Sequence, residues 1–208
     1  MKKTISLLLT ISLIFSFASA QEVWTYDMYK TTDYTNFRSQ DIFNQSFDRD
    51  EPDIPLLNAA MFFLTNEQRV KHNKSAAEYH PALEIAAYNH SKRMAKTKFS
   101  HTGTDADRKT PRQRGELAGI ANPKLAENIA YSHIGDGLTY LDLADKVITQ
   151  WMNSPGHRSN ILSDETHQMA CGAYVEDSYV YSTQNFQWFY KIEEQKAKDK
   201  LPPLKKFK

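Results

Sequence analysis

The most informative part of this chain is residues 151–162, which read WMNSPGHRSNIL. Upstream of it, apolar residues recur at a spacing that places them on one face of a helix. They are Leu141, Ala144, Ile148 and Trp151. Because Pro155 lacks a backbone N–H and disfavours the α conformation at Ser154, we expect this helix to end near Asn153. Gly156 then permits a tight turn.

The turn that we expect after this helix carries a polar pair, His157 and Arg158. Ile161 and Leu162 follow and indicate a return of the chain to the core. A pair held between two buried segments is a candidate binding or catalytic site. The alternative is that His157 has a structural role, because a histidine after a helix end often hydrogen-bonds the exposed carbonyls. These twelve residues alone favour the structural interpretation.

The N-terminus is typical of an exported protein. Residues 1–20 contain two lysines, a continuous apolar run from Ile5 to Phe17 and the small residues ASA. This pattern predicts a secretory signal peptide. The apolar run is too short to span a bilayer comfortably, and no later stretch is long enough. We therefore expect a mature chain that starts near Gln21, has no transmembrane segment, is secreted or periplasmic, and is a monomer.

Charge and cysteine content narrow the possible functions. The chain has 26 Lys and Arg and 25 Asp and Glu, and the predicted signal peptide contains two of the lysines. The mature balance is 24 minus 25, or −1, which gives no indication of a nucleic-acid partner. Cys171 is the only cysteine, so no intramolecular disulfide can form. Its alternating apolar surroundings predict a buried thiol.

Composition divides the chain into four parts. The signal peptide covers 1–20, an aromatic-rich extension covers 21–55, the main domain covers 56–190, and a charged tail covers 191–208. We expect the rings of the extension to cover apolar surface, the alternative being an arm that binds a partner. The tail has seven lysines and three acids, a balance of +4, which predicts a solvated segment.

Within the main domain, apolar periodicity predicts one helix from Leu56 and a second from Pro81, whose apolar face includes His90. His90 is therefore expected in the core. Residues 102–114 are polar and predict a loop. Residues 168–176 and 179–189 alternate as two strands joined by a turn at 176–178. Glu127 and Asn128 lie in a small apolar segment, where a buried carboxylate needs a partner.

Several motifs in order resemble the CAP superfamily, which comprises cysteine-rich secretory, antigen 5 and pathogenesis-related 1 proteins. They are NEQR at 66–69, HS at 90–91 with Met94, FSH at 99–101, AENIA at 126–130, Trp151, and SPGHRSNIL at 154–162. The SPGHR form resembles the bacterial branch. The similarity runs from about residue 56 to 189, and several motifs in the correct order are more specific than any single one.

The resemblance implies an α+β fold, a three-layer α-β-α sandwich with a central antiparallel sheet and a cleft on one side. Members are usually secreted. In the family, two histidines and two acids meet in the cleft and can hold a divalent cation, often zinc. Carried over, these are His101, Glu127 and His157, while Ser154 occupies the position of the second acid. Two imidazoles and one carboxylate are also the ligands of many catalytic zinc sites.

Three functions remain open. The one we favour is a non-enzymatic extracellular module whose cleft binds a small molecule, lipid, glycan or partner protein. The second is a metal-dependent hydrolase of peptides or cell-wall material, with metal on His101, Glu127 and His157. In the third, these three residues form a purely structural network. The residues that we expect in the binding cleft are His101, Glu127, His157, Ser154 and Asn128.

Overall fold

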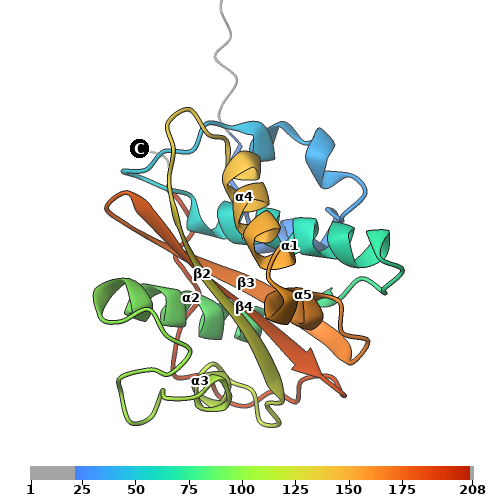
Figure 1. Ribbon diagram of the computed structural model, residues 1–208, viewed down its shortest axis with the longest axis vertical. Coiled ribbons are helices and arrows are strands. Elements are labelled where there is room, and N and C mark those ends of the chain that lie inside the picture. The colour runs from blue at the N-terminus through green and yellow to red at the C-terminus, as the bar shows by residue number, and fades with distance from the viewer. Residues whose placement is uncertain (1–21, 207–208) are drawn as a thin grey trace, which may run out of the picture.

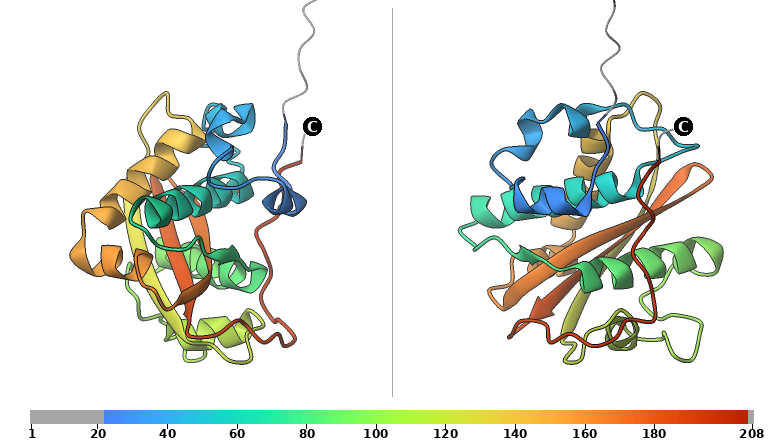
Figure 2. Two further views of the ribbon diagram at one scale, coloured as in Figure 1. Left: turned by 90° about the vertical axis from the view of Figure 1, so that its right-hand side faces the viewer. Right: turned by 180° about the vertical axis from the view of Figure 1, so that it is seen from behind.

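A computed structural model of the chain describes residues 22–206, so the predicted signal peptide at 1–20 lies outside the described residues. The described residues form three layers, with a twisted sheet between two layers of helices (Figures 1 and 2). The helices are α1 (Ile54–Lys71), α2 (Pro81–Lys96), α3 (Pro111–Leu117), α4 (Tyr140–Met152) and α5 (Pro155–Ile161). The strands are β1 (Glu78–Tyr79), β2 (Leu125–His133), β3 (Thr166–Glu176) and β4 (Tyr179–Trp188).

The sheet has the spatial order β1-β3-β4-β2, which makes β2 an edge strand. The three long strands pair antiparallel, and only the two-residue β1 runs parallel to its neighbour β3. A tight turn at Asp177 and Ser178 joins β3 to β4, with Asp177 in the left-handed conformation at φ 53°. The α+β sandwich and the two C-terminal strands expected from the sequence are thus confirmed.

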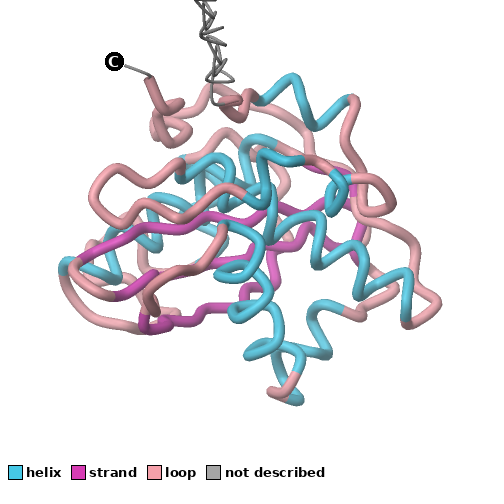
Figure 3. The backbone as a smooth tube through the Cα atoms, turned by 90° about the horizontal axis from the view of Figure 1, so that it is seen from above, coloured by secondary structure: helices cyan, strands magenta, loops and turns pink. Residues whose placement is uncertain are grey.

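Each helical layer covers one face of the sheet. Helices α1, α4 and α5 lie on one face and α2 and α3 on the other, as the side view in Figure 2 shows. Figure 3 shows the strands and the helices around them from above. Helix α2 approaches β3 very closely at Gly172, where a Cβ atom would lie 2.1 Å from the backbone nitrogen of Tyr88. Glycine is therefore required there, because any side chain would push the helix off the sheet.

Helix α4 ends where the sequence predicted, with Asn153 as its C-cap. The segment that follows differs from the expectation of a turn. Residues 155–161 form the short helix α5, with Ser154 as N-cap and Pro155 in its first turn, a position where proline costs no hydrogen bond. Gly156 is not in a left-handed conformation. The proline thus ends one helix and starts the next.

A second difference concerns the expected loop at 102–114. Its last residues start helix α3, whose N-terminus is fixed by a capping box between Thr110 and Gln113. The side chain of Thr110 accepts from the backbone of Gln113 over 3.2 Å, and Gln113 Oε1 accepts from the backbone of Thr110 over 3.0 Å. The rest of the segment is irregular, as expected.

The N-terminal extension is part of the core, which confirms that its rings cover apolar surface. It contains three short 3-10 helices, η1 (Tyr26–Lys30), η2 (Phe37–Ser39) and η3 (Asp41–Asn44). Trp24, Phe37 and Phe43 are fully buried, and each has its ring within 6.0 Å of the ring of Phe63 on α1. Rings of this size contribute much of the apolar area that stabilises a small domain.

The C-terminal tail is mostly exposed, as its charge predicted, but it is also held against the domain. It runs up the back of the molecule from α3 to the extension (Figure 2). Gln195 N donates to Gly119 O over 2.8 Å, Arg108 pairs with Asp199 at 2.6 Å, and Tyr26 donates its hydroxyl to Pro202 O over 2.9 Å. Backbone and side-chain hydrogen bonds thus hold the tail despite its lysines. In residues 22–206 no helix is long and apolar enough to cross a membrane.

Candidate functional site

The candidate site is centred on the carboxylate of Glu127 in β2. Its Oε1 lies 3.0 Å from His101 Nδ1, and its Oε2 accepts from Arg114 Nη2 over 2.6 Å. Arg114 also donates to the backbone oxygen of His101 over 3.2 Å. One arginine on α3 therefore positions both the carboxylate and the loop that carries the histidine.

Burial and charge differ sharply within this group. The side chains of Glu127 and Arg114 are 2% and 4% exposed, whereas that of His101 is 52% exposed. Burial by itself would raise the pKa of Glu127, but the hydrogen bond with His101 and the charge of Arg114 together hold it below its usual value. Glu127 is therefore a buried anion, and the His101 ring that it orients faces solvent.

His90 is buried, as expected from its place on the apolar face of α2, but it also belongs to this site. Its Nε2 lies 3.8 Å from Glu127 Oε1, beyond hydrogen-bond distance. Burial lowers the pKa of His90 to about 4, with a partial offset from the charge of Glu127. His90 is therefore neutral at neutral pH and fills the space behind the carboxylate.

The second predicted histidine, His157, lies on α5, in the opposite helical layer. Its partial burial lowers its pKa, and the nearby charge of His101 lowers it further. Among the described residues it has no hydrogen bond to Glu127. Instead, its backbone oxygen accepts from Asn128 Nδ2 over 3.1 Å, and Asn160 donates to Asn128 Oδ1 over 2.9 Å.

The sheet edge explains how residues from two layers come together. Neighbouring residues of a strand point to opposite faces, so Glu127 faces α2 and α3 while Asn128 faces α5. Because β2 is an edge strand, the helices on the two faces of the sheet are separated at this edge only by β2 itself. Asn160 of α5 donates to the backbone oxygen of Glu127 over 3.4 Å, which secures α5 against this edge. Ser154, the N-cap of α5, makes no side-chain capping bond.

The predicted metal ligands can be tested against this geometry. Both oxygens of Glu127 are already engaged, one by His101 and one by the Arg114 guanidinium, whose positive charge opposes a cation at the same carboxylate. In the described part of the chain, no three His, Cys, Asp or Glu side chains are grouped to hold a metal ion. The arrangement therefore does not fit a resident divalent cation.

Three residues of the site were not predicted as site residues from the sequence. They are Arg114, Asn160 and His90, and of these His90 was expected only in the core. A partner for the buried Glu127 was expected, but no local pattern pointed to an arginine inside a segment that reads as a loop. The capping box at 110–113 was the available signal, because it starts the helix that carries Arg114. Asn160 lies within the SPGHRSN motif, which was identified from the sequence. Its hydrogen bond to Asn128 was not predicted.

Exposed aromatic rings continue from this site along the sheet. Phe99 precedes His101 by two residues, and its ring lies 4.9 Å from that of Tyr131, which is 5.9 Å from Tyr179 and 6.1 Å from Tyr181. Phe99, Tyr131 and Tyr179 are each at least 39% exposed. We call these four rings the aromatic row. Three of the rings come from the neighbouring strands β2 and β4.

Three solved structures are similar to this chain. An extracellular protein with an SCP domain from Bacillus anthracis is 28% identical, with a TM-score of 0.52, over 65% of this chain and 41% of that one. A cysteine-rich secretory protein from Staphylococcus aureus is 22% identical over 64% of this chain and 39% of that one, TM-score 0.48. An outer surface protein of Borrelia burgdorferi is 20% identical, with a TM-score of 0.49, and the match covers 69% of this chain and 97% of that one.

This chain therefore spans well under half the length of the Bacillus anthracis protein. No curated protein sequence matches the chain. The model of the cysteine-rich secretory protein (CAP) family matches residues 62–186, a region that contains His101, Glu127, Arg114 and His157 and makes up more than half of the chain. Together with the three-layer sandwich, this match shows that the chain belongs to the CAP family.

Proposed function

We propose that this protein is an extracellular, non-enzymatic binding module whose site comprises His101, His157 and the aromatic row. The observation that carries the proposal is the half-exposed His101 imidazole, held by the buried Glu127 and Arg114 pair. Residues 1–20 and the extracellular Bacillus anthracis relative support export. A rigidly held polar group beside exposed rings is typical of a binding surface.

The ligand class that fits best is a glycan. Sugar rings present apolar faces that stack on aromatic side chains, together with hydroxyl groups that exchange hydrogen bonds with an imidazole. The aromatic row offers three rings that are 39–48% exposed, and one of them, Phe99, precedes His101 by two residues in the chain. A lipid tail or a small apolar molecule would need an enclosed cavity here rather than an open row.

The hydrolase alternative has less support. Glu127 is engaged on both oxygens and its pKa is held low, which makes it a weak general base. In the described chain, no serine, threonine or cysteine side chain hydrogen-bonds to His101 or His157.

The test is calorimetric titration of the purified protein with soluble oligomers of N-acetylglucosamine, as a representative of cell-wall glycans. We expect saturable binding that His101→Ala and Tyr131→Ala each weaken by about tenfold. His167→Ala and Tyr190→Ala remove an exposed histidine and an exposed ring elsewhere and serve as matched controls. Equal binding by all variants, or hydrolysis of the oligomers, would contradict the proposal.

A further inference from the structure

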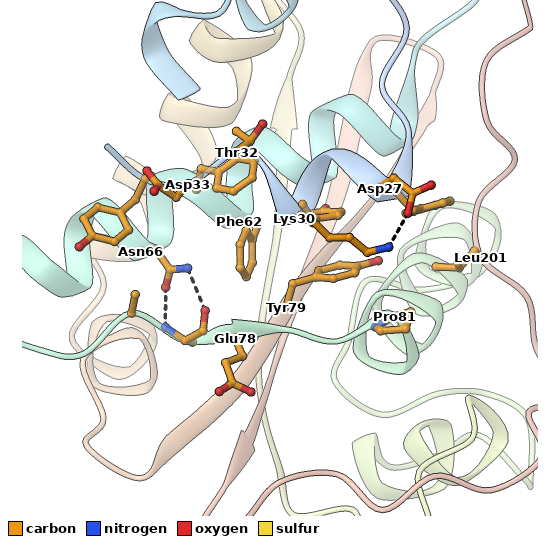
Figure 4. Close-up of a pocket in the computed structure, with 16 residues that line it drawn as sticks. Asp27, Lys30, Thr32, Asp33, Phe62, Asn66, Glu78, Tyr79, Pro81 and Leu201 are labelled. Carbon is orange, nitrogen blue, oxygen red and sulfur yellow. Dashed lines mark hydrogen bonds and ion pairs between the residues drawn. The ribbon is translucent and has the colours of Figure 1, made fainter. Parts of the chain in front are cut away.

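A large pocket lies away from the CAP site, and none of its lining residues belongs to that site. It has a volume of about 660 Å³, within the range of small-molecule sites, and is mainly apolar. Sixteen residues line it, and eight of these lie outside the region matched by the family model. Seven come from the N-terminal extension, and the eighth is Leu201 of the C-terminal tail (Figure 4).

Aromatic rings form the wall of this pocket. Tyr29 of η1 and Tyr79 of β1 stack with ring centres 3.7 Å apart, and the ring of Phe62 stands edge-on to both at 5.4 and 5.8 Å. The hydroxyl of Tyr79 donates to the buried carboxylate of Glu84 over 2.8 Å, and that of Tyr29 lies 3.5 Å from the same oxygen. With both hydroxyls directed into the protein, the rings present apolar surface to the pocket.

The opposite wall is fixed by hydrogen bonds. Asn66 of α1 donates to the backbone oxygen of Ala77 over 3.0 Å and accepts from its nitrogen over 2.8 Å (Figure 4). Asn66 is buried, and so is Ala77. The segment between α1 and β1 is therefore held in place, and the pocket is preformed.

The charges around the pocket are mostly negative. Of the lining residues, Asp27, Asp33 and Glu78 are acidic and only Lys30 is basic. Lys30 pairs with Asp27 at 2.7 Å, and Glu78 pairs with Lys191 at 2.7 Å. The Asp33 carboxylate accepts hydrogen bonds from the uncharged Thr35 nitrogen and hydroxyl, at 2.7 and 2.6 Å, and within residues 22–206 no ion pair to a basic side chain is formed. Its charge therefore has no cationic partner among the described residues.

We propose that this pocket binds a small amphiphilic cation, with its apolar body against the Phe62 and Tyr79 rings and its ammonium group at Asp33. Aromatic faces carry negative potential that attracts cations, and an unpaired carboxylate at the rim adds to that attraction. An anionic amphiphile of the same shape would face the repulsion of Asp33. The site is independent of the proposed glycan site.

The test uses octyltrimethylammonium, octyl sulfate and octanol, which share one chain length and differ in head-group charge. Titration calorimetry on the purified protein should show saturable binding of the cation and weaker binding of the other two. Ala76 is exposed and lines the pocket, so Ala76→Phe should fill it and weaken binding by about tenfold, while Ala76→Ser should leave binding unchanged. Asp33→Asn keeps the acceptor oxygen, removes the charge, and should weaken binding by about fivefold.

Equal affinity for octyl sulfate or octanol would overturn the assignment of a cation. Unchanged binding to a folded Ala76→Phe variant would overturn the assignment of this pocket. The Ala76→Phe variant should bind N-acetylglucosamine oligomers normally. Loss of cation binding and loss of glycan binding therefore report on two separate sites.

Discussion

Arg114 donates to the carboxylate of Glu127 over 2.6 Å, and both side chains are almost completely buried. This ion pair joins α3 to the edge strand β2 and lies directly behind the half-exposed ring of His101. A buried pair of this kind contributes little net stability compared with apolar packing, but loss of one partner is costly.

Removal of the Arg114 charge is therefore expected to destabilise the protein. Arg114→Met leaves Glu127 buried without its cationic partner, and we expect a loss of about 3–5 kcal/mol in the free energy of unfolding, measured by urea denaturation. Arg112→Met is the matched control, because Arg112 is exposed and pairs only with Glu116 on the same helix; it should cost less than about 1 kcal/mol. Equal effects of the two substitutions would contradict a buried ion pair.

Metal addition and removal should leave stability unchanged, because Arg114 and His101 already occupy the Glu127 oxygens. We expect neither zinc nor a chelator to shift the melting temperature, and we expect purified protein to contain no stoichiometric metal. The measurements are a thermal shift series and elemental analysis, with a His101→Ala, His157→Ala double variant alongside. A stabilising, stoichiometric metal that the double variant lacks would show that the pair with Arg114 opens to admit a cation.

Glu84 should make stability depend on pH. Its burial raises the pKa of the carboxyl to about 7, partly offset by hydrogen bonds from Asn58, Tyr79 and Tyr29. Between the unfolded pKa of about 4.3 and 7 the folded state holds the extra proton, so the free energy of unfolding falls as pH rises through this window, by roughly 4 kcal/mol in total.

The variant Glu84→Gln should remove that fall, because its amide is neutral at every pH and can still hydrogen-bond to Asn58 and Tyr79. Urea denaturation of both proteins at pH 5 and pH 8 checks this. The variant should be the more stable of the two at pH 8 and close to the parent at pH 5. A parent whose stability rises from pH 5 to pH 8 relative to the variant would contradict the raised pKa.

The pKa of His157 should depend on the charge of its neighbour His101. Partial burial and the charge of His101 both lower the pKa of His157. Protonation of His157 therefore opposes folding. The stability that neutral His157 contributes is lost as pH falls from its unfolded pKa to its lower folded pKa. In His101→Ala, the pKa of His157 should rise, as an NMR titration of the imidazole protons would show. An unchanged His157 pKa would mean that the two rings do not interact.

Two glycines should respond oppositely to alanine. Gly156 lies within α5, and a Cβ atom there would contact nothing within 4 Å, so Gly156→Ala should stabilise the protein by about 0.5–1 kcal/mol. Gly119 has φ +100°, and its Cβ would lie 2.9 Å from Gln195 O in the C-terminal tail. Gly119→Ala should therefore cost about 1–3 kcal/mol. Thermal and urea unfolding measure both, and destabilisation by Gly156→Ala would refute the helical assignment.

Local sequence patterns predicted the long elements and misjudged the short ones. The helices from residue 56 and from Pro81, the end of α4 at Asn153, and the two C-terminal strands were predictable, because periodicity and helix-breaking residues act over a few neighbours. Helix α5 was expected to be a turn, since Pro155 and Gly156 disfavour a helix interior. They are tolerated because the proline occupies the first turn, where its missing N–H has no partner to lose.

The sequence by itself determined the family and the burial of Cys171 and of the aromatic extension, because each depends on motif order or apolar content. It also predicted His101, Glu127 and His157 as the site residues. The tertiary structure alone decided how those residues are used. It placed Arg114 on Glu127, separated His157 onto the opposite layer, and held the charged tail against α3 and the extension. These contacts join residues far apart in the chain, and local spacing carries no information about which distant partner satisfies a buried charge or an open backbone group.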